Sequence, residues 1–330
     1  MSRLDVRLVS EAGVERRAAA ELEELLRRGD GLVWVDIPAC DAEATRVLSN
    51  VFGFHPRAVQ DCAQRNPVPK VHVYPDHVFV VLHAPESGAS GHVHYVELDQ
   101  FVGPGYFVTV HGPLNPSVDP DAALVETAAL QRRLETGRLR PASTFELSFA
   151  VVTALAGRLR DYLTTLTQEV WRLEQQVTAG ELGDPEQFLE LMFRVRHGLL
   201  TVRTMATLSR EVYGRMVTLG VFGSGAGHSL LTDTVDQFQR IGTMADSQKD
   251  YLQGVIEFYQ TRTNTKMTIA AERLAVIAAV TLPVTALSSI VGMNVIVNDR
   301  THFEWLALLL AVMGLMSVTL LVWAKRKGWW

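Results

Sequence analysis

The clearest pattern in this 330-residue chain is a pair of long apolar segments near its C-terminus. Residues 274–298 and residues 305–324 carry no charged side chain, and they are about 25 and about 20 residues long. A helix rises roughly 1.5 Å per residue and a bilayer core is roughly 30 Å thick, so each segment is long enough to cross a membrane. The pattern predicts transmembrane helices over residues 274–294 and 305–324, joined by a loop over residues 295–304.

Basic residues flank the predicted hairpin on one side of the membrane. Those before the first segment and after the second are Arg262, Lys266, Arg273, Lys325, Arg326 and Lys327. Because Lys and Arg accumulate in cytoplasmic flanks, we expect both termini in the cytoplasm, with residues 325–330 as a basic tail and residues 295–304 as an external loop. The N-terminus lacks the apolar core of a secretory signal, which favours a multi-pass protein of the cell (inner) membrane.

The N-terminal third alternates short β-type runs with helical stretches. The β-type runs fall at residues 3–9, 32–37, 71–74, 77–83, 93–98, 101–102 and 106–110, and the helical stretches at residues 15–28, 41–52 and 56–63. Gly, Pro and Asn residues separate them, as expected for turns. This order predicts an α+β domain in which helices flank a mixed β-sheet.

From Pro120 onward the composition is helical, with breaks at residues 137–141, 180–185 and 220–227. Residues 229–291 contain no proline before Pro283, which predicts one helix of about 60 residues and about 90 Å. We expect residues 1–228 to form a cytoplasmic domain with a helical layer. Residues 229–273 are then a stalk helix that continues into the first span.

Apolar residues recur along the predicted stalk at roughly heptad steps. They are Val235, Phe238, Ala245, Leu252, Val255 and Tyr259. Glutamines interrupt this stripe at positions 248, 253 and 260. The pattern therefore favours a loose parallel bundle of stalks around a partly wet axis over a tight two-stranded coiled coil.

Charge and cysteine content exclude several classes of function. The net charge is −5, with 31 Lys and Arg against 36 Asp and Glu, so we expect no nucleic-acid partner. Cys40 and Cys62 lack metal-type spacing and fit reduced thiols in the cytosol. The sequence has no Walker loop and no nucleophile motif, so we expect no enzyme.

Several motifs occur in a fixed order along the chain. The first apolar segment contains Leu282-Pro283-Val284-Thr285 and then Gly292-Met293-Asn294 at its outer end, and the chain ends in the basic, Trp-containing tail. The N-terminal domain carries His55-Pro56, Asp61 and Pro69-Lys70-Val71 ahead of a strand pair, and a later strand ends with residues 107–111. With these motifs the chain resembles the CorA family of divalent-cation channels and transporters over nearly its whole length.

The resemblance implies a homopentamer whose first transmembrane helices line one pore, with Gly292, Met293 and Asn294 as the ion selectivity filter. Mg²⁺ holds its waters tightly, so neutral oxygens suffice: side-chain carbonyls of five Asn294 residues, and backbone carbonyls that Gly292 allows near the axis. Met293 carries a soft thioether, so we expect it to shape the entrance by packing. The alternative is that Gly292 and Asn294 only cap a helix.

The resemblance also implies which residues line the pore below this filter. Thr285 matches a pore-facing threonine, although its hydroxyl could instead bond back to a carbonyl near Pro283. Leu282 and Leu274 would form constrictions that close by excluding water, or could face neighbouring helices. Glu257 occupies the position of an acidic ring that would concentrate cations, or is a solvated helix residue.

Asp233 and Asp236 lie one helical turn apart at the start of the stalk. Asp233 matches a family position that helps to bind a regulatory ion between subunits, and Glu86, on the predicted loop from Pro85 to His92, is our suggested partner. Such an ion would remove repulsion between carboxylates and hold the interface shut, so falling cytosolic Mg²⁺ would favour opening. The alternative is that both aspartates favour a helix N-terminus.

Two departures from the family pattern bear on ion choice. The residue before Gly292 is usually tyrosine and here is Val291, and the acidic Met-Pro-Glu loop is absent, leaving Asp299 and Glu304 as outer anions. Both departures affect ion preference and cation steering more than the fold.

These observations predict a homopentameric magnesium channel in the lipid membrane, moving hydrated Mg²⁺, and also Co²⁺ or Ni²⁺, into the cytoplasm under control of cytosolic Mg²⁺. One alternative is a zinc transporter of a related branch; another is a non-conducting membrane-anchored ion sensor or scaffold. His92 and His94 would share one face of a strand and could suggest a Zn²⁺ site, but no third ligand lies nearby in sequence.

Overall fold

The computed structural model describes residues 4–88, 91–113, 115–180, 184–221, 225–295 and 303–326, and for residues 291–295, 303 and 306 it describes the backbone but not the side chain. The chain divides into two compact units, residues 1–255 and residues 256–330. The long helix α8 (Ala226–Val295) contributes to both units.

A seven-stranded mixed sheet forms the centre of the first unit. Its strands are β1 (Asp5–Ser10), β2 (Gly13–Arg17), β3 (Leu32–Ile37), β4 (Lys70–Val73), β5 (Val78–Ser87), β6 (Val93–Val102) and β7 (Tyr106–His111). The spatial order is β2-β1-β3-β7-β6-β5-β4, with β3 and β7 parallel and all other neighbours antiparallel. Strands β5 and β6 are buried along most of their length, so their sequences show little polar alternation.

Three short helices pack on one face of this sheet. They are α1 (Leu22–Arg28), α2 (Ala42–Arg46), which continues into a π-helical turn at Val47–Val51, and α3 (Pro56–Ala63), and a 3₁₀ turn at Ala19–Glu21 precedes α1. His55 caps α3 by accepting a hydrogen bond from the Arg57 N–H, and Pro56 occupies its first position. The core under these helices includes Leu22, Val35 and Phe101.

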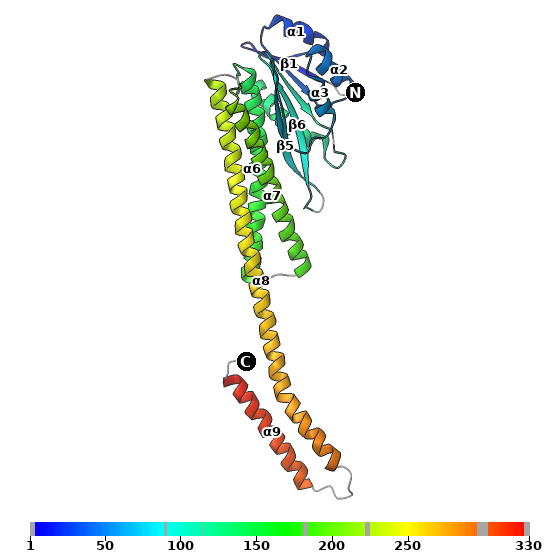
Figure 1. Cartoon of the computed structure of the whole chain (residues 1–330), viewed down its shortest axis with the longest axis vertical. Coiled ribbons are helices and arrows are strands. Elements are labelled where there is room, and N and C mark those ends of the chain that lie inside the picture. Colours follow the sequence, from blue (N-terminus) through cyan, green and yellow to red (C-terminus); the bar gives the residue numbers. More distant parts are fainter. Residues whose placement is uncertain are drawn as a thin grey trace. The chain divides into compact units, whose positions relative to one another are not determined.

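The opposite face of the sheet is covered by one short helix and three longer helices (Figure 1). These are α4 (Pro120–Ala123), α5 (Val125–Glu135), α6 (Thr144–Ala179) and α7 (Pro185–Thr218). Ser143 and Asp184 cap the starts of α6 and α7, and Gly180 ends α6 with φ of 82°. The breaks predicted from the sequence therefore coincide with helix ends.

The apolar stripe of α8 packs against other helices of the same chain. Phe238, Ala245 and Leu252 have no exposed surface, and the ring of Phe238 lies 6.0 Å from that of Tyr213 on α7. The stripe was predicted to face a bundle of stalks from several copies. That prediction is wrong for these residues, because the chain's own helices already cover them.

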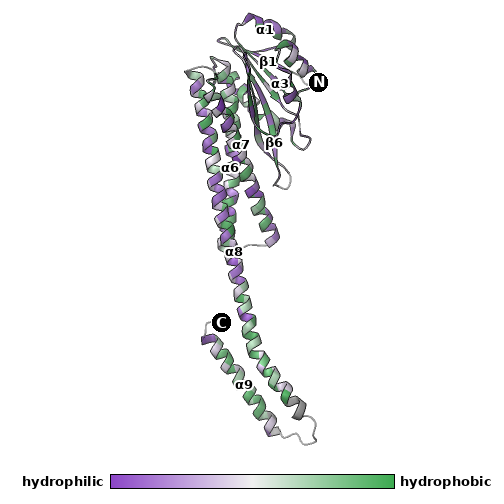
Figure 2. Ribbon diagram, in the orientation of Figure 1, coloured by the Kyte–Doolittle hydropathy of each residue, from purple (hydrophilic) through white to green (hydrophobic). Residues whose placement is uncertain are grey.

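Within the described part of the chain, two helices are long and apolar enough to cross a membrane, by length and composition. One segment is Ala226–Ile290 of α8 and the other is Ala307–Arg326 of α9 (Phe303–Arg326), with mean hydropathies of 1.7 and 2.3 in their most apolar windows. Only 6% of each window is buried. Hydrophobic residues dominate the C-terminal part of α8 and most of α9 (Figure 2).

The structure differs from the sequence prediction at β2 and β6, and also at the end of β5, which extends to Ser87. Residues 15–28 were predicted to be helical, but Gly13–Arg17 forms β2, after a turn in which Gly13 adopts φ of 131°. Strand β6 is continuous through Asp99 and Gln100, which are fully buried. A buried carboxylate inside a strand made one element look like two.

Candidate ion pathway and regulatory residues

The predicted pore residues lie on one helix, the second half of α8. Thr285 donates a hydrogen bond from its hydroxyl to the Thr281 carbonyl at 2.9 Å, and Thr281 does the same to the Ile277 carbonyl at 2.8 Å. Pro283 between them has no N–H to offer the preceding turn. The back-bond considered for Thr285 is therefore formed, and the hydroxyl oxygen keeps a lone pair that can accept from ion-bound water.

Leu274 and Leu282 are both 66% exposed in the single chain. Leu282 and Thr285 are three residues apart, so they lie on the same side of the helix. Burying side chains this apolar against lipid or other protein is favourable, because it removes them from water. Their exposure is compatible with both alternatives given for them, a pore constriction and a helix contact.

The filter motif lies in the last turns of α8. The helical backbone includes Gly292, Met293 and Asn294 and ends at Val295, but these side chains, with that of Val291, lie outside the described residues. The predicted external loop is described only at its ends, where Val295 belongs to α8 and Phe303 and Glu304 belong to α9. In α9, Trp305 and Trp323 are exposed, as expected for residues at the water boundaries of a span.

The acidic residues singled out on the predicted stalk are Glu257, in its second half, and Asp233 and Asp236, near its start. Glu257 is exposed, and its backbone carbonyl accepts the Thr261 hydroxyl at 2.9 Å. Asp233 and Asp236 are exposed on the first turns of α8, and Gln237 donates to Asp233 Oδ2 at 2.8 Å. Their carboxylates are thus on the surface of the chain, where an ion or a second copy can reach them.

Glu86 has a different setting from the predicted one. It lies on β5 rather than on a loop, and Arg158 Nη2 donates to its Oε2 at 2.5 Å. Arg158 also donates to Glu126 Oε1 on α5 at 3.1 Å and to the Ala122 carbonyl at 2.8 Å. Glu86 is therefore charge-paired inside its own chain, and an ion would have to replace this guanidinium.

No group of three or more His, Cys, Asp and Glu side chains that could hold a metal ion occurs among the described residues. The rings of His92 and His94 lie 4.7 Å apart, and Asn115 Nδ2 lies 3.1 Å from His94 Nδ1. His92 precedes β6 and only His94 belongs to it, which alters the predicted same-face arrangement.

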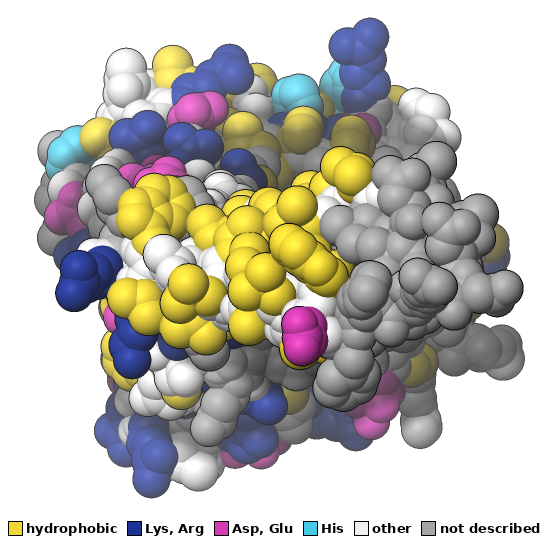
Figure 3. All heavy atoms as spheres, turned by 90° about the horizontal axis from the view of Figure 1, so that it is seen from below, with side chains coloured by type: hydrophobic (Ala, Val, Ile, Leu, Met, Phe, Trp, Pro, Cys, Tyr) yellow, Lys and Arg dark blue, Asp and Glu magenta, His cyan; other side chains and the backbone are white. Residues whose placement is uncertain are grey.

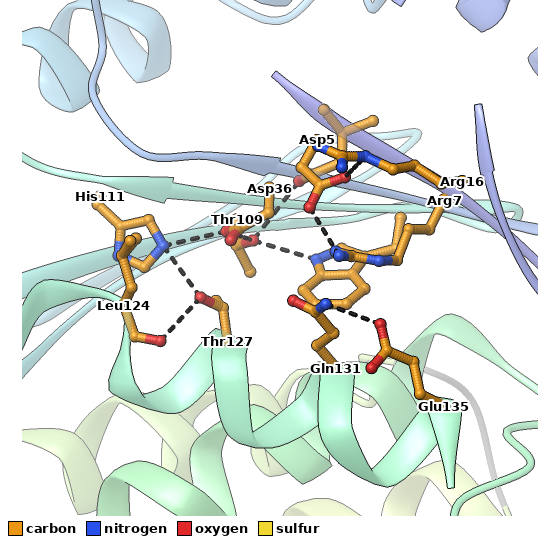
Figure 4. A network of polar contacts seen from close by, with 12 residues as sticks. Asp5, Arg7, Arg16, Asp36, Thr109, His111, Leu124, Thr127, Gln131 and Glu135 are labelled. Atoms are coloured by element: carbon orange, nitrogen blue, oxygen red, sulfur yellow. Dashed lines mark hydrogen bonds and ion pairs between the residues drawn. The ribbon is translucent and has the colours of Figure 1, made fainter. Parts of the chain in front are cut away.

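A buried polar network that the sequence analysis missed ties the parallel strands to α5 (Figure 4). Asp36 Oδ1 on β3 accepts from the Thr109 hydroxyl at 2.5 Å and lies 3.0 Å from His111 Nε2, which in turn lies 3.3 Å from Thr127 Oγ1 on α5. Burial acts to raise the pKa of Asp36, but the charge of His111 and hydrogen bonds from His111, Thr109 and Thr127 outweigh it, so the pKa is lowered.

This network has a structural role, because every partner comes from an element of the domain core. The Trp34 indole N–H adds a further bond to Thr109 Oγ1 at 3.1 Å. The bonds between β3 and β7 join residues more than 70 positions apart in sequence, so spacing gave no signal.

These features define a class of protein. Its members have a mixed-sheet domain, one long helix whose C-terminal part is apolar, and a second apolar helix. A family model described as "CorA-like Mg2+ transporter protein" matches residues 29–326, and the chain belongs to this family. The predicted membership and the predicted fold class are both confirmed.

Three relatives illustrate the similarity. The chain is 24% identical over 305 residues to YfjQ of Bacillus subtilis, a protein named as a candidate metal ion transporter, covering 90% of this chain and 89% of that one. It is 22% identical over 313 residues to the cobalt/magnesium transport protein CorA of Thermotoga maritima, covering 90% and 83%. The solved CorA magnesium transporter of Methanocaldococcus jannaschii has the same fold, with a TM-score of 0.81, 15% identity, and coverage of 100% and 99%.

Proposed function

We propose that this protein is a homopentameric channel of the cell membrane that moves hydrated Mg²⁺ into the cytoplasm, where both of its termini lie. Co²⁺ and Ni²⁺ are proposed as further cargo. The observation that carries the proposal is α8, a single helix from Ala226 to Val295 that bears the acidic stalk residues, an exposed apolar segment and Gly-Met-Asn in one element. Membership of the CorA-like family supports Mg²⁺ as the cargo.

Several copies are needed because two spans cannot enclose a pore. Five copies of α8 around one axis would place five Asn294 amides and the Gly292 carbonyls at the outer entrance, with Met293 packed behind them. An ion that keeps its waters meets only neutral oxygens there, which bind it weakly enough to release it. Moving two charges inward gains about 4.6 kcal/mol per 100 mV of membrane potential.

The inner half of the proposed pore combines apolar and acidic rings. Leu282 and Leu274 would close it by excluding water, and Thr285 would contact ion-bound water between filter and constriction. Glu257 would form an anionic ring that raises the cation concentration at the inner mouth.

Gating is assigned to cytosolic Mg²⁺ at Asp233 and Asp236, with Glu86 of an adjacent copy as the proposed partner. Bound Mg²⁺ would neutralise opposed carboxylates and hold the copies together, and its loss would favour opening. Because Arg158 already pairs with Glu86 at 2.5 Å, we expect Glu86→Gln to weaken inhibition less than Asp233→Ala does.

The filter is tested by flux into liposomes containing a magnesium-sensitive dye. Asn294→Ala should lower Mg²⁺ flux at least tenfold, while Asn264→Ala, an exposed asparagine on the same helix, should leave it unchanged. Equal flux in the wild type and Asn294→Ala would reject the filter. No flux from any variant or from the wild type would favour the sensor or scaffold instead.

Gating and ion choice need two further measurements. Asp233→Ala should weaken inhibition by Mg²⁺ on the cytosolic side, whereas Asp250→Ala, which removes another exposed carboxylate from α8, should not. Competition among Mg²⁺, Co²⁺, Ni²⁺ and Zn²⁺ then ranks the cargo. Flux that is fastest with Zn²⁺ and resistant to Mg²⁺ would replace the magnesium assignment by the zinc one.

A further inference from the structure

A polar groove in the first unit is lined by none of the residues assigned to the ion pathway or its regulation. It has a volume of about 740 Å³ and lies between α3, β4 and the C-terminal end of α7. The lining includes Arg57 of α3, Lys70 and His72 of β4, Arg215 of α7, and the rings of His55 and Tyr74. This volume falls in the range of small-molecule sites, roughly 300–1,000 Å³.

The groove is cationic although the chain as a whole is acidic. Three of its lining side chains are Arg or Lys, and its one carboxylate, Asp61, is paired with Lys70 Nζ at 2.7 Å. Arg57 and Arg215 have no carboxylate partner among the described residues. Two guanidinium groups from different helices are therefore left to bind an anion, and guanidinium forks match phosphate oxygens in geometry.

The positive charges of the groove act on the pKa of His72. Partial burial lowers its pKa, and the charges of Lys70, Arg215 and Arg57 lower it further, against the opposing effect of Asp61. Three cationic groups from three elements thus act at one point. Such a field repels Mg²⁺ and attracts anions, which separates this groove from the proposed cation pathway.

Buried contacts hold the walls of the groove in place. The carboxylate of Glu97, on β6, accepts from the Asn66 backbone N–H at 2.8 Å and from its side-chain amide at 2.5 Å, which fixes the connection between α3 and β4. The rings of His55 and Tyr74 stack with centroids 5.3 Å apart. These contacts fix the backbone of the groove, whereas the exposed side chains of Arg57 and Arg215 become ordered when a ligand binds.

We propose that this groove binds a soluble anion with two or more phosphate groups, with nucleoside di- and triphosphates and inorganic pyrophosphate as its sources. Arg57 and Arg215 contact the phosphates, Lys70 adds charge, and His72 takes up a proton when the anion enters. The competing explanation is that Arg215 only interacts with the C-terminal end of the α7 dipole while Arg57 is solvated, which predicts no binding.

The test is titration calorimetry of the full-length protein in detergent, with EDTA present so that no divalent ion can bridge. Pyrophosphate, ATP, AMP and adenosine are compared. Pyrophosphate and ATP should bind, AMP more weakly, and adenosine not at all. Equal affinity for ATP and pyrophosphate identifies the phosphates as the whole determinant, and tighter binding of ATP identifies the nucleotide as the source.

Charge variants separate the groove from general attraction. Arg57→Gln and Arg215→Gln should each weaken pyrophosphate binding about tenfold, and Arg133→Gln, which removes an exposed arginine of α5 outside the groove, should not. Binding measured in two buffers of different ionisation enthalpy should reveal proton uptake that falls in His72→Gln. Absence of millimolar binding, adenosine binding alone, or full affinity in the Arg57→Gln, Arg215→Gln double variant overturns the proposal.

Discussion

The two units of this chain treat the same kinds of residue in opposite ways. In residues 1–255, Trp34, Phe79 and Phe101 have less than 2% of their surface exposed. In residues 256–330, Leu282 is 66% exposed and Leu315 is 71% exposed. The first unit completes its core within one chain, whereas the second leaves its apolar surface to be covered from outside.

Exposure by itself does not identify the environment of a side chain. The first unit also exposes large apolar residues, such as Trp171 on α6 and Leu189 and Phe193 one turn apart on α7, but such small groups are ordinary for a surface in water. In the second unit the exposed apolar side chains follow one another along α8 and α9, and they form a broad hydrophobic surface (Figure 3). A surface of this extent indicates lipid or further copies of the chain.

The largest effect is expected from breaking the core of the first unit. Phe101 stacks on Phe54 with ring centroids 3.9 Å apart and lies 4.6 Å from Phe79. Phe101→Ala removes this packing and leaves a cavity, so it should lower the free energy of unfolding of the first unit by about 3–5 kcal/mol. Urea unfolding of the detergent-solubilised protein measures it.

The matched control for this prediction is Phe193→Ala, which truncates an exposed phenylalanine of α7. It should change the free energy of unfolding by about 0.5 kcal/mol or less. Similar losses in the two variants would show that Phe193 is packed against something outside the chain, and the contrast between the units would weaken.

A second prediction separates exposure to lipid from exposure to water. Leu315 and Phe193 are both 71% exposed, but Leu315 lies at the middle of the apolar segment of α9. Leu315→Arg should destabilise membrane insertion by about 2.5–3.5 kcal/mol, whereas Phe193→Arg should leave insertion unchanged. The fraction of chain that resists carbonate extraction from membranes measures insertion, and equal fractions for the two variants would contradict the assignment of α9 as a span.

The sequence was sufficient to predict an element where the pattern that signals it is local. Hydrophobic periodicity predicted most strands, the long helix α8 and the two apolar helices, because each depends on neighbours a few residues away. It failed at Asp99, where a buried carboxyl group lies inside a continuous strand, and at the edge strand β2, where exposed charged residues look helical. Both failures arise because pairing with another strand outweighed local preference.

The candidate site residues also differ in whether a local motif reveals them. Gly292, Met293 and Asn294 were found from a short motif and its position between two spans. The pairing of Glu86 with Arg158 could not be found in this way, because these residues are 72 apart in the chain. The polar groove between α3, β4 and α7 is harder still to predict from the sequence. Arg57, Lys70 and Arg215 come from three elements, and none belongs to a motif that signals phosphate.

The smallest of these effects concerns the buried polar network of the first unit. Thr109→Val keeps the shape of the side chain but removes the donor to Asp36 and the acceptor for the Trp34 N–H. It should lower the free energy of unfolding by about 1–3 kcal/mol near neutral pH. Thr153→Val is the control, because the Thr153 hydroxyl is buried with no hydrogen-bond partner among the described residues, and its loss should cost nothing or stabilise.

The pH dependence of this loss in unfolding free energy shows how much of it depends on the charge of Asp36. The pKa of Asp36 is lowered in the folded protein, so its ionised form contributes stability that is present above its ordinary unfolded value of about 3.9 and disappears as the pH falls through the folded value. Without the Thr109 hydroxyl the folded pKa rises, so the difference between Thr109→Val and the wild type should shrink as both proteins become protonated at Asp36. Hydrogen exchange of the β3 and β7 amides from pH 7 down to pH 3 measures this. A difference that stays constant over that range would assign the whole effect to the Trp34 bond and to packing.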